Sequence, residues 1–132
     1  MIKSASQLSL QSILKLDAAT CAAMGALLAL ASAPVAGLTQ ISASLLLWAG
    51  LVLFPVAGFM FACAQARRVP MWATGLVVVG NGLWVLASLA LPLAGLIVPN
   101  ALGWLFLVAQ AVVVLVFAAL EWGAVLQRPV AS

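Results

Sequence analysis

Short segments that contain proline, glycine or arginine divide the chain into four long apolar runs. The runs are residues 13–33, 43–66, 71–91 and 101–126. A helix rises about 1.5 Å per residue, so each run is long enough to cross the roughly 30 Å hydrocarbon core of a bilayer. The pattern predicts an all-α fold, a transmembrane four-helix bundle, with a polar lead-in at residues 1–12 and a tail at residues 127–132.

A stripe of small residues follows the acid of the first run. Cys21, Gly25 and Ala29 come after Asp17 at every fourth position. Residues four apart lie on the same face of a helix. Small residues allow helix backbones to approach closely in lipid. We therefore expect this face of the first helix to pack against another helix.

The basic residues indicate how the four spans are oriented. In a four-span arrangement all five lie on the same side of the membrane: Lys3, Lys15, Arg67, Arg68 and Arg128. Basic residues are enriched on the cytoplasmic side of membrane proteins. The charges therefore predict a multi-pass membrane protein with both termini and the loop at residues 65–70 in the cytoplasm.

The composition excludes a soluble domain. Hydrophobic residues make up 67% of the chain and charged residues 5%, whereas about a quarter of the residues of a soluble domain are charged. The net charge of +3 follows from topology and does not indicate a nucleic-acid partner. We expect membrane lipid to surround the protein.

The first run could be mistaken for a signal peptide that is cleaved after Ala33. We expect it to be a retained helix, because Pro34 would hinder that cleavage.

Two short segments match at an offset of 58 residues. Residues 34–38 read PVAGL and residues 92–96 read PLAGL, and each follows a span that runs outward. Such a match is typical of two helical hairpins related by an axis along the membrane normal. Since proline and glycine are common in loops, chance similarity explains the match equally well.

Two amides lie near the middle of their spans. Asn81 belongs to the third run, on one face with Thr74 and Ser88, and Gln110 belongs to the fourth. An amide without a partner is costly in lipid, so we expect hydrogen bonds between the third and fourth helices. The alternative is that both amides, with nearby Trp84, line a ligand pocket.

The only acids are Asp17 and Glu121. Both are expected near the cytoplasmic boundary, at the level of Arg67 and Arg68. One interpretation is a structural ion-pair cluster at the inner interface. The other is a protonatable carboxylate that binds a cation or couples transport to protons.

Few residues could support catalysis or metal binding. The chain has no histidine, so it lacks the commonest general base and zinc ligand. Cys21 and Cys63 form no CxxC pair, and we interpret them as small buried hydrophobic residues. We predict no metal, no cofactor and no enzymatic activity.

Several spaced motifs resemble a group of small, uncharacterised bacterial four-span membrane proteins. The motifs are Leu16-Asp17-Ala18, Ala49-Gly50-Leu51 with Pro55, Asn81-Gly82-Leu83-Trp84-Val85 with Ala87-Ser88, and Ala109-Gln110-Ala111 with Leu120-Glu121. The resemblance covers residues 16–122. It implies a four-helix fold in a bacterial inner membrane, without implying an activity. Small multidrug transporters are similar in size, but their first-helix acid is a deeper glutamate and their aromatic site residues have no match here.

Two functions are compatible with these observations. The first is a non-enzymatic structural or accessory subunit, which forms a homo-oligomer or joins a larger membrane complex. The second is a small proton-coupled transporter or lipophilic-ligand binder that uses Asp17 or Glu121.

Substitution of the two acids distinguishes these functions. For a transporter or binder, Asp17→Asn and Glu121→Gln should abolish pH-dependent uptake or binding, because the titrating group is lost. For a structural subunit, the same substitutions should mainly change assembly or stability. Uptake and binding assays across a pH series, run beside a measurement of oligomeric state, separate the two results.

Overall fold

The computed structural model describes residues 9–127 and is helical almost throughout. The long helices are α2 (Leu10–Leu30), α4 (Ala43–Ala64), α5 (Met71–Leu93) and α6 (Ala101–Leu126). A short helix, α3 (Ser32–Thr39), lies between α2 and α4, and the described residues contain no strand. All four long helices are apolar enough to cross a membrane. The all-α four-span fold is therefore confirmed, and the chain is an integral membrane protein.

The first span begins three residues earlier than the sequence predicts. The Ser9 hydroxyl accepts a hydrogen bond from the Ser12 backbone N–H at 3.1 Å and so caps α2. As a result, Asp17 lies seven residues inside the helix instead of four. At the other end of this span, much of the expected loop at residues 34–42 is the helix α3, with Pro34 in its first turn.

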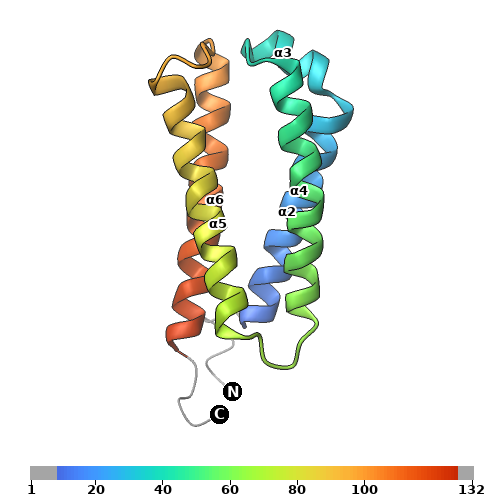
Figure 1. The fold of residues 1–132 in the computed structure, drawn as a ribbon, viewed down its shortest axis with the longest axis vertical. Helices are drawn as coiled ribbons and strands as arrows, with labels where there is room; N and C mark the ends of the chain where they lie inside the picture. Colours follow the sequence, from blue (N-terminus) through green and yellow to red (C-terminus); the bar gives the residue numbers. More distant parts are fainter. Residues whose placement is uncertain (1–8, 128–132) are drawn as a thin grey trace.

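The helices form two hairpins (Figure 1). In one hairpin α2 packs along α4, and in the other α5 packs along α6. The hairpins approach each other mainly where α6 contacts α2 and α3. The backbones of α4 and α5 stay farther apart, and side chains bridge them near the arginine-bearing loop, where the Phe59 and Trp72 rings lie with their centroids 6.4 Å apart.

The close packing of α2 on α4 depends on two glycines. A Cβ atom at Gly50 would lie 2.8 Å from the Ala29 backbone nitrogen and 2.9 Å from the Gly25 carbonyl oxygen. A Cβ atom at Gly25 would lie 3.0 Å from the Gly50 oxygen. The small-residue face of the first helix therefore packs on another helix, as its spacing predicts.

One end of the bundle, here termed the arginine end, carries residues 65–70 together with the start of α2 and the end of α6 (Figure 1). Leu14, Met60 and Val69 are almost fully buried there. The Gln11 side chain donates a hydrogen bond to the Arg67 carbonyl at 2.8 Å. This end is therefore closed by a packed core. Lys3 and Arg128 lie outside the described residues.

At the opposite end, Asn100 joins the two hairpins. Its side-chain nitrogen donates to the Leu38 carbonyl at 2.9 Å, and its backbone N–H donates to the Thr39 carbonyl at 3.1 Å. Its side-chain oxygen caps α6 by accepting from the Gly103 N–H at 2.8 Å. The hairpins are therefore tied together beyond the apolar part of the bundle.

The two matching pentapeptides differ in conformation. Residues 34–38 lie within α3, whereas residues 92–96 include the last turn of α5 and a turn in which Gly95 has a φ of 79°. The two hairpins therefore share an overall arrangement without sharing the structure of these segments.

The glycine contact predicts that Gly50→Ala lowers the free energy of unfolding by about 1–3 kcal/mol, because the added methyl group forces α2 and α4 apart. Gly58→Ala, on the same helix, is the matched control: a Cβ atom there meets nothing within 4 Å. The control should be neutral or should stabilise by up to about 1 kcal/mol through helix propensity. Unfolding titrations in mixed micelles measure both changes, and equal effects of the two substitutions would contradict the packing described.

Candidate functional site

Three polar side chains from three helices meet inside the bundle. Asp17 comes from α2, Asn81 from α5 and Glu121 from α6, and their exposed fractions are 2%, 6% and 0%. The Asn81 side-chain nitrogen donates to Asp17 Oδ2 and to Glu121 Oε1, at 3.1 Å in each case. We term these residues the acid–amide cluster. It joins the two hairpins, since Asp17 belongs to one and the other two residues to the second.

The helices bring these residues to a similar depth. Asp17 lies seven residues from the start of α2, Asn81 ten from the start of α5 and Glu121 five from the end of α6. All three positions are measured from the arginine end, because α6 runs in the opposite direction to α2 and α5. At about 1.5 Å per residue, they lie about 8–15 Å inside the bundle. The lengths of the side chains make up the remaining difference in depth between the three backbone positions.

The other carboxylate oxygens have few partners. Asp17 Oδ1 accepts a weak hydrogen bond from the Cys21 thiol at 3.6 Å. Glu121 Oε2 is buried and accepts no hydrogen bond from any described residue. A buried polar atom without a partner is uncommon, because it bears the full cost of leaving water.

The two arginines are placed differently from the two acids. Arg67 and Arg68 lie in residues 65–70 and are solvent-exposed, and Lys15 on α2 is also exposed. The hydrogen bonds that buried Asp17 and Glu121 accept within the described chain come from Asn81 and Cys21. The structure therefore brings the two acids together with an amide at their centre.

A second polar group lies farther from the arginine end. The Trp84 indole N–H donates to Gln110 Oε1 at 2.7 Å, and the Gln110 nitrogen donates to the Ser88 hydroxyl at 2.8 Å. These bonds join α5 to α6, so Gln110 links the third and fourth spans as expected. Asn81 instead contacts the two acids. Thr74 and Ser88, which share its helix face, are buried as well.

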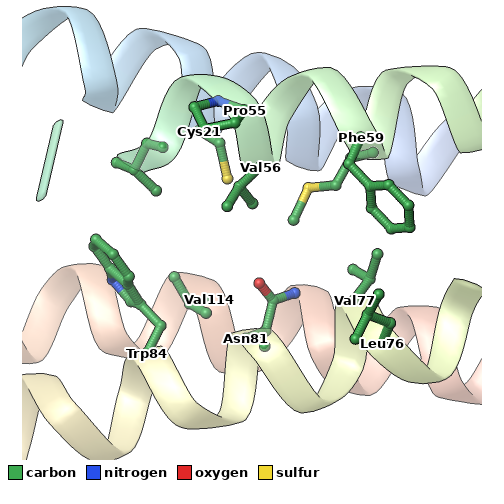
Figure 2. Close-up of a pocket in the computed structure, with 12 residues that line it drawn as sticks. Cys21, Pro55, Val56, Phe59, Leu76, Val77, Asn81, Trp84 and Val114 are labelled. Atoms are coloured by element: carbon green, nitrogen blue, oxygen red, sulfur yellow. The ribbon is translucent and has the colours of Figure 1, made fainter. Parts of the chain in front are cut away.

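A cavity of about 370 Å³ lies between the hairpins, on the side where α4 and α5 separate. Figure 2 shows Pro55, Val56 and Phe59 on one wall and Trp84 on the other, with the Asn81 carboxamide pointing into the space between them. Two further cavities, of about 210 and 140 Å³, share the Trp84 side chain with it as part of their lining. We term the three together the interhairpin cleft.

Polar groups occur at only a few points of this cleft. Asp17 and Gln110 line its smallest cavity, Asn81 lines the largest, and Trp84 lines all three. The remaining lining is almost entirely apolar. Predominantly apolar walls with a few polar groups are typical of sites for small lipophilic ligands. Within residues 9–127, no group of three acids or cysteines could hold a metal ion.

Comparison of the chain with known protein families, with curated proteins and with solved structures finds no match. The site is therefore interpreted from its geometry. Sequence reasoning identified Asp17, Glu121, Asn81, Gln110 and Trp84 as candidates. It did not identify the thiol contact of Cys21, although the spacing of four from Asp17 was the available signal.

The shared amide predicts that Asn81→Leu destabilises the bundle. Both acids then lose a donor without gaining access to water, which should lower the free energy of unfolding by about 1–3 kcal/mol. Glu121→Gln should be less harmful in the Asn81→Leu background than in the wild type, because it removes one of the two acids that have lost their donor. A double-mutant cycle in mixed micelles measures this coupling, and strictly additive losses would argue against the contact.

Proposed function

We propose that the protein binds a lipophilic molecule in the interhairpin cleft and does so without catalysing a reaction. The observation that supports this proposal is the cavity of about 370 Å³, with its apolar lining and the Asn81 carboxamide directed into it. Pockets for small ligands have volumes of about 300–1,000 Å³ and combine apolar walls with a few placed polar groups. The cleft has both properties.

Access from the membrane is consistent with the arrangement of the helices. The cleft lies where the backbones of α4 and α5 are apart, on the side of the Phe59–Trp72 contact that faces away from the arginine end. A helix satisfies its own backbone hydrogen bonds, so these two helices can face either lipid or a ligand. The arginine end is closed by the packing of Leu14, Met60 and Val69. A ligand would therefore enter sideways from the bilayer.

The proposed setting is a bacterial inner membrane with both termini in the cytoplasm. Lys15, Arg67 and Arg68 support this orientation because they lie toward the same end of the bundle, and basic residues are enriched on the cytoplasmic side. Association with a second copy or a larger membrane complex, as an accessory subunit, stays a prediction. The exposed apolar faces are compatible with it, but lipid would cover them equally well.

Two glycines on α5 allow the binding proposal to be tested. Gly80 lines the largest cavity, and a Cβ atom there meets nothing within 4 Å. Gly80→Leu should therefore fill the cleft without a clash and lower binding of the neutral probe N-phenyl-1-naphthylamine at least tenfold. Native mass spectrometry counts the probe bound to the protein, so probe dissolved in lipid or detergent does not contribute.

Gly82→Leu is the matched control. A Cβ atom there also has open space, and the position lies about 200° around the helix from Gly80. Both substitutions replace glycine within a helix, so their propensity effects are similar. The control should bind the probe as the wild type does. Equal binding by the wild type and both variants would contradict a ligand site in the cleft.

A further inference from the structure

We propose that the ligand of the cleft is a lipophilic organic cation of single charge, and that its binding releases one proton held between Asp17 and Glu121. This inference rests on the proposed function, because it names the class of molecule that the cleft takes. Two observations support the inference: the position of the two acids, and the buried Glu121 oxygen that has no hydrogen-bond partner in the described chain.

The acids form a site for positive charge because they are paired and buried. One amide nitrogen lies 3.1 Å from an oxygen of each, which brings the two carboxylates side by side. Two ionised carboxylates side by side are very costly in a site removed from water. A single proton between them removes one charge and supplies the O–H donor that a carboxylate pair otherwise lacks. It also accounts for a Glu121 oxygen without another donor.

The neighbouring elements provide little other charge. Within the described chain, the titratable groups on α2 besides Asp17 are Lys15, which is exposed, and the Cys21 thiol. On α4 the only such group is the Cys63 thiol, α5 has none, and Glu121 is the only one on α6. Arg67 and Arg68 are exposed at the arginine end. A cation in the cleft would therefore act on the acid pair directly.

The cleft brings a ligand to one member of this pair. Asp17 lines the smallest cavity and Asn81 the largest, whereas Glu121 does not line either of them. A cation would contact Asp17 and Asn81, with Glu121 behind them. When the cation enters, the shared proton leaves for water and no covalent bond changes. The site has a charge of −1 before binding and −1 afterwards, so the exchange adds no net charge to the membrane interior.

The walls select the type of cation. Sodium and other small ions prefer a shell of several oxygen ligands, whereas this cleft is lined mainly by aliphatic and aromatic side chains. Trp84 lines every part of it, and an indole face attracts a cation. An organic cation whose charge is spread over an apolar body matches both the walls and the acids.

The test compares a cation with a neutral molecule of similar shape. Tetraphenylphosphonium carries a permanent charge and no proton of its own, and triphenylphosphine oxide is its neutral counterpart. Titration calorimetry of the full chain in lipid nanodiscs, in buffers of different ionisation enthalpy, counts the protons released. Empty nanodiscs and the Gly80→Leu variant give the background.

The wild type should bind the cation at least tenfold more tightly than the neutral compound and should release about one proton for each cation bound. Because one proton leaves, affinity for the cation should rise with pH, by about tenfold per unit in the range where the pair holds its single shared proton. Affinity for the neutral compound should not change with pH. The Asp17→Asn/Glu121→Gln variant should lose both the preference and the proton release, so that it binds the cation no more tightly than the neutral compound. An unfolding titration beside the wild type shows that the variant is folded.

Three results would overturn the proposal. Equal affinity for the two compounds in the wild type would refute a cation site and leave the lipophilic-ligand proposal intact. Preference for the cation without proton release would refute the exchange. If neither compound bound above the Gly80→Leu background, and the neutral naphthylamine probe also did not bind, the proposed function itself would fail.

Discussion

The hydrogen bonds of Asn81 hold the two hairpins together inside the membrane. Hydrophobic burial contributes little between helices in lipid, so packing and interhelical hydrogen bonds must hold them. Within each hairpin, the close packing of the two helices along their length holds them together. Between the hairpins the contact is much smaller, and the buried polar link is one carboxamide that donates to Asp17 and to Glu121. Both acids depend on this amide, since it donates to each of them at 3.1 Å.

The placement of the contacts between the hairpins also produces the interhairpin cleft. The core of the arginine end closes the bundle on one side of the cluster, and the hydrogen bonds of Asn100 tie the hairpins at the opposite end. Between these points the backbones of α4 and α5 stay apart, bridged by the Phe59 and Trp72 rings. The close glycine contact that joins α2 to α4 at Gly25 and Gly50 has no counterpart among the α5 glycines, which have open space around them. The cleft therefore follows from where the small and polar residues are placed, and it opens beside the acid–amide cluster.

The apolar runs predict the spans closely, because length and hydropathy alone define a membrane helix. The bounds of α6 match the expectation, and Met71 begins α5 as expected. The depth of Asp17 was less predictable, since it depends on the cap at Ser9. Which helices meet at Asn81 could not be derived either. The spacing of seven between Thr74, Asn81 and Ser88 places Asn81 on a buried face of its helix. The rotation of one hairpin against the other then decides whether that face meets Gln110 or the acids.

The most direct test of this account is whether the Asn81 amide lies against the Glu121 carboxyl group. The chain has two acids in total, so carboxyl-labelled glutamate marks Glu121 alone, and its two asparagines, Asn81 and Asn100, lie far apart along the bundle. Solid-state NMR of the protein in lipid, with ¹³C-labelled glutamate and ¹⁵N-labelled asparagine, measures the dipolar coupling between the two groups. The account predicts a coupling that disappears in Asn81→Leu and persists in Asn100→Leu. The absence of any coupling in the wild type would contradict the cluster, and with it the proposed cation site.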